Sequence, residues 1–329
     1  MNLSVVIPVY NEEQSLPGLH SAMQQALSNS GRLWEVVYVN DGSVDRSSQV
    51  LEELAKADPE HVRVIEFRRN FGQTAAIAAG IDFSTGDIIV LMDADMQNDP
   101  ADIPMMVENI DQGYDVVSGW RANRQDTFLT RTLPSRIANW LISTVTGVHL
   151  HDYGCTLKAY RREVITGFRL YGEMHRFIPA YASSVGAKMV EVKVHHHPRK
   201  FGKTKYGLSR TVKVVLDLFT VKFLMNFANK PIYLFGGTGV TLMFFSSAAL
   251  FFLAVRRLGF GIPILTSPIF QVSTMLFILG FQSILMGLIA EMLVRTYHES
   301  QQKPTYNIRR VIAPNSSAKA GGSVPHPDP

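Results

Sequence analysis

The segment LMDADMQNDP at residues 91–100 places three aspartates, Asp93, Asp95 and Asp99, close together after an apolar run. Carboxylates at this spacing repel one another unless a cation neutralises them. If the extended conformation of the apolar run continued, Asp93, Asp95 and Gln97 would point to one side, because side chains alternate along a strand. Three oxygen ligands on one side suit a hard cation such as Mg²⁺ or Mn²⁺. The alternative is a solvated turn that caps the following helix.

A second candidate for chemistry is HHHPRKFGKTKYGLSR at residues 195–210, which is basic and contains no acid. Gly202 and Gly207 indicate a flexible loop, and such a loop can close on a diphosphate and stabilise the charge of a leaving group. The alternative is a juxtamembrane segment attracted to anionic lipid, and the two roles are compatible. The three histidines are better explained as strand-end residues than as metal ligands. The basic residues are Arg199, Lys200, Lys203, Lys205 and Arg210.

Another basic group occupies residues 121–136, where Asp126 is the only acid. The formal net charge is only +4, and basic and aromatic residues do not alternate, which argues against nucleic acid as a partner. A phosphorylated small molecule or lipid is therefore the expected partner. The group consists of Arg121, Arg124, Arg131 and Arg136.

Asp152 and Cys155 lie in the segment HDYGCTLKAYRR at residues 151–162. Asp152 precedes a glycine turn and is either a turn former or a carboxylate that points into a site. Cys155 has no obvious base nearby and is expected to be a small buried residue rather than a nucleophile. As the single cysteine, it excludes an internal disulfide bond and fits a reducing compartment.

Five apolar segments are expected to form the strands that position these groups. Helices separate them, one of which is the small-residue segment GQTAAIAAGIDF, suited to close packing, and another has an apolar face of Leu16, Leu19, Met23 and Leu27. Continuous apolar strands that alternate with helices predict an α/β domain with a mainly parallel sheet covered on both faces. The strands are expected at residues 3–10, 34–40, 62–67, 87–92 and 115–120.

The carboxyl edge of this sheet is the expected ligand site, because open α/β sheets bind ligands there. The first strand leads into PVYNEE instead of G-x-G-x-x-G, and no G-x-x-x-x-G-K-[ST] occurs. Without a glycine cradle, a bound diphosphate must be neutralised by a metal and by basic side chains. Residues that fall at this edge are Tyr10, Asp41, Arg69, Asp93 and Asp95.

Two uncharged segments, residues 232–255 and 268–290, are each long enough to span roughly 30 Å of hydrocarbon as a helix. Core helices seldom run this far without a charge, so a transmembrane hairpin is favoured. The N-terminus lacks the basic region of a signal peptide, so the first two-thirds of the chain are expected to stay in the cytoplasm. Arg256 and Arg257 in the connecting loop weakly oppose this orientation. Basic residues that support it are Lys222, Lys230, Arg295, Lys303, Arg309 and Arg310.

Residues 208–228 mix basic and bulky apolar positions, which predicts amphipathic helices in the membrane interface. Gly236, Gly237 and Gly239 favour helix association and hence a homo-oligomer. The expected organisation is a catalytic domain at 1–207, juxtamembrane helices at 208–230, two transmembrane helices at 231–295, and a cytosolic segment at 296–329 that is disordered at its end.

Taken together, these motifs resemble glycosyltransferase family 2 and its GT-A fold. The resemblance covers most of the chain and rests on VVIPVYNEE, VNDGSVDRS, RRNFGQTAAIAAG, DADMQNDP, HHHPRKFGKTKYG and the C-terminal hairpin. Within the family the chain is similar to the polyprenyl-phosphate glycosyltransferases, which include the dolichol-phosphate mannose synthases. NRQD at 123–126 and DYGCTLKAYRR at 152–162 are most similar to the formamido-arabinose branch. The Q-x-x-R-W motif of processive synthases is absent.

The resemblance implies a role for each candidate residue. A metal, Mg²⁺ or Mn²⁺, that bridges the donor diphosphate would be held by Asp93, Asp95 and Gln97. The nucleotide base and ribose would lie against Pro8, Tyr10 and Glu12, with Asp41 holding the base. The diphosphate would be gripped by two residues of an R-x-x-G-x-[ST]-K pattern, Arg199 and Lys205. The lipid phosphate would be received by Arg121, Arg131 and Ser135.

The implied reaction is one inverting transfer from a nucleotide sugar, expected to be a UDP-sugar, to undecaprenyl phosphate at the inner membrane. A phosphate monoester is largely dianionic at neutral pH, its second pKa being about 6, so a strong base is less necessary. Asp152 would orient the acceptor or share its proton. The alternatives are a non-catalytic membrane scaffold that binds nucleotide sugars and a transferase with a different acceptor. A lipid flippase is disfavoured because the spans lack an ionisable residue at mid-depth.

Overall fold

The computed structural model describes residues 2–122, 139, 142–144, 146–166, 174–198, 232–260, 263–265, 267–300 and 306–313. The chain divides into two compact units, Met1–Val221 together with Pro304–Pro329, and Lys222–Lys303. They are named here the sheet unit and the hairpin unit. The predicted amphipathic helices at 208–230 lie outside the described residues.

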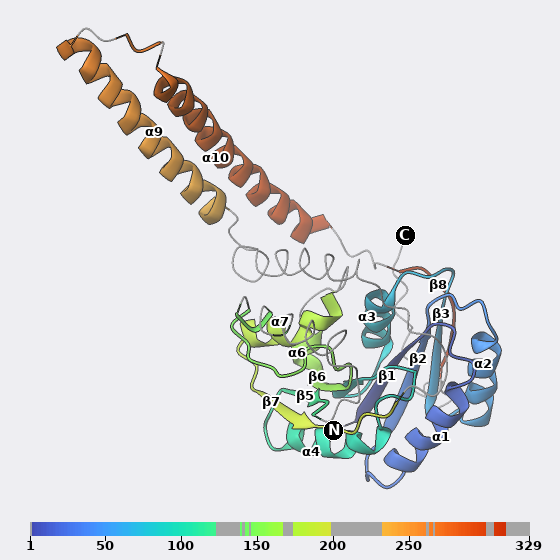
Figure 1. The fold of residues 1–329 in the computed structure, drawn as a ribbon. Coiled ribbons are helices and arrows are strands. Elements are labelled where there is room, and N and C mark those ends of the chain that lie inside the picture. Colours follow the sequence, from blue (N-terminus) through green and yellow to red (C-terminus); the bar gives the residue numbers. More distant parts are fainter. Residues whose placement is uncertain are drawn as a thin grey trace. The chain divides into compact units, whose positions relative to one another are not determined.

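The sheet unit is built on one eight-stranded sheet in the order β7-β5-β6-β4-β1-β2-β3-β8 (Figure 1). Strands β1 to β4 pair in parallel and so do β5 and β7, whereas β6 and β8 run antiparallel to their neighbours. The mainly parallel sheet predicted from the sequence is therefore confirmed. The strands are β1 (Leu3–Val9), β2 (Trp34–Asn40), β3 (Val62–Phe67), β4 (Ile88–Leu91), β5 (Val116–Trp120), β6 (Lys158–Arg161), β7 (Met189–Lys193) and β8 (Ile308–Ile312).

Helices cover both faces of this sheet. In Figure 1, α1, α2 and α4 lie along one face, and α3, α6 and α7 lie along the other. The apolar face predicted for α1 is buried, from Leu16 to Leu27. The helices are α1 (Leu16–Leu27), α2 (Ser47–Ala57), α3 (Gln73–Phe83), α4 (Ile103–Asp111), α6 (Arg162–Ile165) and α7 (Ile178–Ser184), with short 3-10 helices η1 (Pro100–Asp102) and η3 (Met174–Phe177).

Helix α3 approaches the sheet at very short range. A Cβ atom on Gly80 would lie 2.2 Å from Cγ1 of Val6 and 3.3 Å from Cγ2 of Val39, so no side chain fits there. The close packing predicted for this small-residue helix is confirmed. As a result, the N-terminus of α3 lies at the carboxyl edge of the sheet, next to the loop that follows β3.

The chain changes direction across the sheet at β1, with β2 and β3 on one side and β4 on the other. The ladder between β1 and β4 ends at the pair Val6–Leu91, so Pro8, which has no N–H group to donate, lies beyond it. Ligands of open α/β sheets bind outside such a switch point. The loops that follow β1, β2 and β4 therefore form the expected site.

Strand β8 closes the β3 edge of the sheet with residues from the end of the described chain. It pairs antiparallel with β3, and Arg310 forms ion pairs with Glu66 and Glu52. The hydroxyl group of Tyr306 donates to Oδ2 of Asp82 at 2.7 Å. This strand is not among those expected from the sequence.

The hairpin unit consists of α9 (Ile232–Phe260) and α10 (Pro268–Ser300). Both contain a stretch long and apolar enough to cross a membrane, Tyr233–Phe260 and Pro268–Ala290, in agreement with the predicted spans. Buried positions recur at heptad spacing on both helices, which is typical of a continuous helix–helix seam. They are Gly239, Ser246 and Leu253 on α9 and Ser273, Gly280 and Gly287 on α10.

The two helices of the hairpin meet backbone to backbone. A Cβ atom on Gly239 would lie 2.5 Å from the carbonyl oxygen of Gly280, and one on Gly280 would lie 2.7 Å from that of Gly239. Gly239 therefore packs inside the hairpin and is not available to a second copy. The homo-oligomer predicted from this glycine group stays a prediction that rests on Gly236 and Gly237.

Candidate functional site

The loops after β1 and β2 are tied together by hydrogen bonds. The backbone N–H of Asn11 donates to Oγ of Ser43 at 3.0 Å, and that of Glu12 donates to Oγ of Ser47 at 2.9 Å. Asn11 adopts a φ of 55°, a conformation that asparagine tolerates. These bonds fix the backbone around three half-buried residues predicted to line the nucleotide pocket, Pro8, Tyr10 and Glu12.

Asp41 is buried at the end of β2 and holds the loop that leads into α3. Its Oδ1 accepts the backbone N–H of Phe71 at 2.6 Å, and its Oδ2 accepts that of Gly72 at 2.9 Å. Burial raises the pKa of Asp41 even though these two bonds favour the charged form. Both oxygens thus order the start of α3, and the contact of Asp41 with a nucleotide base stays a prediction.

Asp93 and Asp95 follow β4 in a turn and not in a continued strand. Met96 has a φ of 58°, and the backbone N–H of Gln97 donates to Oδ1 of Asp95 at 3.1 Å. The extended conformation needed for strict alternation is absent, because the Asp95 side chain stabilises the turn. Nε2 of Gln97 lies 3.5 Å from the carbonyl oxygen of His197. The two carboxylates share the end of β4, and a metal contact of Gln97 stays a prediction.

The surroundings of Asp93 fit a divalent cation. Burial, and then repulsion by Asp95, raise the pKa of Asp93 to about 6, while Thr156 and Arg121 oppose the shift. Nε2 of Gln73 donates to Oδ1 of Asp93 at 2.7 Å. Adjacent carboxylates are ligands that Mg²⁺ and Mn²⁺ favour. Within the described ranges, no three histidine, cysteine, aspartate or glutamate side chains are grouped to hold a metal, so amides, water or substrate would complete this shell.

Asp99 and two of the neighbouring histidines have structural partners. Oδ1 of Asp99 accepts the N–H of Ala101 at 2.9 Å, which caps η1. Nδ1 of His195 lies 2.8 Å from Oδ1 of Asp102, and Nε2 of His197 lies 3.0 Å from Oδ2 of Asp99. The histidines follow β7 and pair with carboxylates of the η1 region, as expected for strand-end residues.

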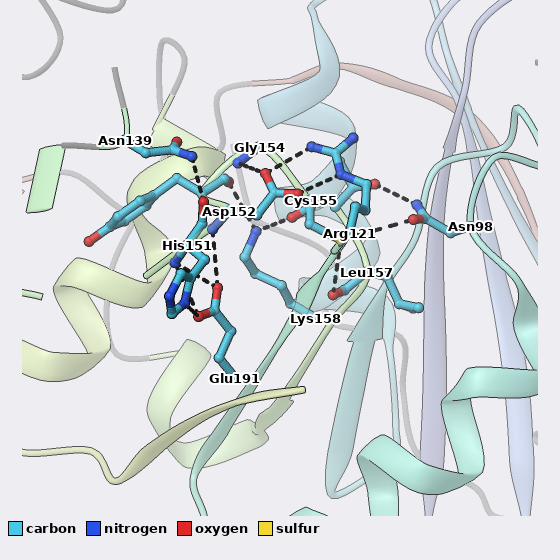
Figure 2. Close-up of polar contacts among 12 residues, drawn as sticks. Asn98, Arg121, Asn139, His151, Asp152, Gly154, Cys155, Leu157, Lys158 and Glu191 are labelled. Atoms are coloured by element: carbon cyan, nitrogen blue, oxygen red, sulfur yellow. Dashed lines mark hydrogen bonds and ion pairs between the residues drawn. The ribbon is translucent and has the colours of Figure 1, made fainter. Parts of the chain in front are cut away.

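Arg121 and Asp152 form a bidentate ion pair (Figure 2). Nε of Arg121 lies 2.7 Å from Oδ2 of Asp152, and Nη2 lies 2.9 Å from Oδ1. The N–H of Gly154 also donates to Oδ1 at 3.1 Å, which agrees with the turn-forming alternative for Asp152. A carboxylate paired with a guanidinium is a weak base, because the opposite charge stabilises its ionised form. Asp152 is therefore a partner of Arg121 in this structure, and its role toward the acceptor stays a prediction.

Cys155 is 1% exposed, and burial raises the pKa of its thiol. Both facts agree with the small buried residue that the sequence predicts. The remaining predicted site residues lie outside the described part of the chain, and their contacts with the diphosphate and the lipid phosphate stay predictions. They are Arg131, Ser135, Arg199 and Lys205.

Two residues near the acidic pair were not singled out in the sequence. Gln73 donates to Asp93 from the first residue of α3. Thr156 acts to lower the pKa of Asp93, and its Oγ1 accepts from Nδ2 of Asn98 at 3.0 Å. Nothing local to the acidic motif indicates either contact. The one available signal for Gln73 is its place at a helix start that the topology brings to the carboxyl edge.

Residues 4–168 match the model of the family described as glycosyl transferase family 2. A dodecaprenyl-phosphate galacturonate synthase from Rhizobium johnstonii is 41% identical over 321 residues, which cover 97% of this chain and 95% of that protein. An undecaprenyl-phosphate 4-deoxy-4-formamido-L-arabinose transferase from Pseudomonas aeruginosa is 40% identical over 319 residues, which cover 96% of this chain and 92% of that protein. The similarity to both relatives thus extends through the hairpin unit.

Solved structures resemble about two thirds of the chain at lower identity. A crystal structure of glucosyl-3-phosphoglycerate synthase from Mycobacterium tuberculosis, in complex with Mn²⁺, uridine diphosphate and phosphoglyceric acid, matches 68% of this chain and 78% of its own with a TM-score of 0.50 and 17% identity. A second mycobacterial protein matches 67% of this chain and 74% of its own with a TM-score of 0.51 and 19% identity. At such low sequence identities, these matches show a similarity of fold alone. By its family model and its full-length relatives, the chain belongs to glycosyltransferase family 2, and the enzyme class and GT-A-like fold predicted from the sequence are confirmed.

Proposed function

We propose that this glycosyltransferase transfers one sugar from a nucleotide sugar, a UDP-sugar, to undecaprenyl phosphate. The proposal is carried by sequence identity. Over nearly the full chain, about two residues in five are identical to those of enzymes named for dodecaprenyl and undecaprenyl phosphate. Such a reaction needs groups that bind a metal, groups that bind phosphate, and attachment to the membrane. The chain has carboxylates at the switch point, an arginine near them and an apolar helical hairpin.

In the proposed step, an oxygen of the lipid phosphate attacks the anomeric carbon of the donor sugar. A new carbon–oxygen bond forms, the bond from that carbon to the β-phosphate oxygen breaks, and its electron pair leaves with the nucleoside diphosphate. The displacement inverts the anomeric centre. The phosphate nucleophile is already ionised, with a second pKa of about 6, so no residue needs to remove a proton. The ion pair of Asp152 with Arg121 is consistent with this.

Asp93 and Asp95 are proposed to hold a divalent cation, Mg²⁺ or Mn²⁺. When bound, the cation supplies charge stabilisation for the departing diphosphate. Gln73 orients Asp93 through the bond to Oδ1. Arg121 is proposed to receive the acceptor phosphate, together with Arg131 and Ser135. Arg199 and Lys205 are proposed to grip the donor diphosphate.

The hairpin unit is proposed to hold the enzyme in the inner membrane, with the sheet unit in the cytoplasm. The chain leaves the sheet unit before α9, and β8 rejoins that unit after α10. A hairpin that crosses the membrane twice would therefore keep both of its ends on the side of the sheet unit. This is also the side on which basic flanking residues are expected.

Incubation of membranes with undecaprenyl phosphate and a panel of UDP- and GDP-sugars, followed by mass spectrometry of the lipid, tests the proposal. We expect one sugar to appear on the lipid phosphate and EDTA to prevent it. Asp95→Asn should abolish transfer, whereas the control Asp99→Asn, which alters the cap of η1, should retain it. Absence of product with every donor, or full activity of Asp95→Asn in EDTA, would contradict the proposal.

A further inference from the structure

Lys158 is a buried lysine to which the proposed reaction assigns no role. It is the first residue of β6, opposite Leu91 of β4 and Ser118 of β5, and it is 3% exposed. Burial lowers the pKa of its ammonium group. A buried charge is costly unless polar contacts compensate for it, and an apolar side chain would fill this strand position without that cost. Its contacts therefore need an explanation.

The ammonium group of Lys158 holds the loop that follows Asp152. Nζ donates to the carbonyl oxygen of Tyr153 at 3.2 Å and to that of Cys155 (Figure 2). These two residues flank Gly154, whose N–H donates to Oδ1 of Asp152. Lys158 thus fixes both sides of the turn that carries the Asp152 carboxylate.

Glu191 of β7 holds the start of the same loop. Its Oε1 accepts the backbone N–H groups of His151 at 2.9 Å and of Asp152 at 3.1 Å, and its Oε2 lies 2.7 Å from Nδ1 of His151. The Glu191 side chain is 12% exposed. A carboxyl group from β7 and an amino group from β6, the strands on either side of β5, therefore fasten the backbone before and after Asp152.

The group that this loop holds is the guanidinium of Arg121. Asp152 occupies Nε and Nη2, and Nη1 donates to no residue that the structure describes, which leaves donors for a phosphate. A Cβ atom on Gly154 would lie 3.2 Å from Nη2 of Arg121, so the loop also packs against the guanidinium. The loop thus sets the position of the Arg121 guanidinium.

We propose that Lys158 is a positioning residue for the acceptor phosphate: it locks the loop of residues 152–157 so that Asp152 holds Arg121 with its remaining donors toward the lipid phosphate. This inference rests on the proposed function, in which Arg121 receives that phosphate. It predicts that loss of the lysine charge weakens use of the acceptor and spares use of the donor.

Lys158→Met, with Arg161→Met as matched control, tests the inference. Methionine keeps an unbranched side chain and removes the charge. Arg161, at the other end of β6, also binds backbone carbonyls, those of Ile110 at 2.6 Å and Tyr114 at 3.2 Å. We expect KM for undecaprenyl phosphate to rise about 10- to 100-fold in Lys158→Met, by analogy with the loss seen when a residue that orients a metal ligand is removed. KM for the nucleotide sugar, and both constants in Arg161→Met, should stay near wild type.

Gly154→Ala gives a second test that leaves Lys158 in place, because its new methyl group would press on Arg121. It should raise the acceptor KM selectively even if Lys158→Met does not fold. An acceptor KM unchanged in both variants, an equal rise in the donor KM, or the same selective rise in Arg161→Met would overturn the inference. Failure of the wild-type protein to modify undecaprenyl phosphate with any donor would instead defeat the proposed function, so the two failures are distinguishable.

Discussion

In the sheet unit, large side chains fill the core: Tyr38 and Phe67 are at most 2% exposed. In the hairpin unit, the buried seam includes Gly239 and Gly280, whereas Phe251 is 71% exposed. In both units apolar residues pack between helices or strands. The sheet unit buries large apolar side chains, whereas the hairpin unit buries small residues and exposes large apolar ones.

The difference follows from the medium that each unit is adapted to. In water, burial of apolar surface stabilises a fold by about 25 cal/mol per Å², so large apolar side chains are placed inside. Lipid tails are as apolar as leucine, so helices in a bilayer gain from close backbone contact and small residues line their interface. Two core helices of a water-soluble protein would instead present polar side chains outward. The reversed pattern supports the proposal that α9 and α10 lie in a membrane.

The largest expected effect on the free energy of unfolding is that of truncating a core side chain in the sheet unit. Leu19 of α1 is fully buried, so Leu19→Ala should lower the free energy of unfolding by about 2–5 kcal/mol. Leu288 of α10 is 49% exposed, and Leu288→Ala should leave the stability of the hairpin in detergent nearly unchanged. Urea titrations of the detergent-solubilised protein measure both. An equal loss in the two variants would show that Leu288 packs against protein, and the comparison would fail.

The next largest effect is expected from a charge placed on an exposed apolar residue. Its cost in free energy should be large in the hairpin unit and small in the sheet unit. Phe244 of α9 and Val185 after α7 are 67% and 66% exposed. Phe244→Asp should cost about 2.5–3.5 kcal/mol of membrane insertion. Val185→Asp should change stability by no more than about 0.5 kcal/mol, because it meets water. The share of protein that remains in carbonate-washed membranes measures the first effect. Full retention of Phe244→Asp would contradict a lipid-facing α9.

The glycine contact of the hairpin can be tested by overpacking. Gly280→Val should destabilise the helix pair by about 1–3 kcal/mol, because the added atoms meet the backbone of α9. Ser246 lies seven residues after Gly239, and Ser273 lies seven residues before Gly280, so the two serines face each other across the antiparallel helix pair. A cysteine pair at these two positions should therefore cross-link readily. Gly280→Val should slow that cross-linking. Gly237→Val, at a position with open space around it, is the control. Equal cross-linking in all three proteins would disprove the seam.

The core of the sheet was predictable from local sequence. Strands expected at 34–40 and 62–67 have those bounds in the structure, because buried parallel strands are continuous apolar runs. Strand β8 was not predictable in the same way. Its sequence, IRRVI, carries two arginines, and its strand conformation depends on pairing with β3 and on Glu66, more than two hundred residues earlier.

The residue types of the site were predictable from the sequence, but the hydrogen bonds between them were not. Spacing and topology put Asp93 and Asp95 at the carboxyl edge, yet a side-chain bond from Asp95 to the backbone replaced the expected strand alternation. Lys158 and Glu191 look like ordinary strand residues in the sequence. Their importance lies in contacts made across the sheet, which no local pattern encodes.

The smallest expected effect is on the pH dependence of the two units. His20 of α1 is buried, with Nδ1 3.2 Å from the hydroxyl oxygen of Tyr38. Burial lowers the pKa of His20, although Asp58 opposes the shift. The unfolded chain therefore binds the proton first, so the stability contributed by neutral His20 is complete above about pH 6.5 and is lost as the pH falls toward the folded-state pKa. One proton limits the slope to about 1.4 kcal/mol per pH unit.

Urea midpoints of wild type and His20→Gln between about pH 7.5 and about pH 5.5 measure this slope, since their difference isolates His20 from other titrating groups. The wild-type midpoint should fall on acidification more steeply than that of the variant. Residues 233–255 and 268–290 of the hairpin contain no Asp, Glu, His, Lys or Arg, so its thermal unfolding in detergent should change little over the same range. Identical slopes in wild type and variant would show that His20 is not a titrating group of the core. A hairpin with the same pH dependence would show that titrating groups outside these apolar segments contribute to its stability.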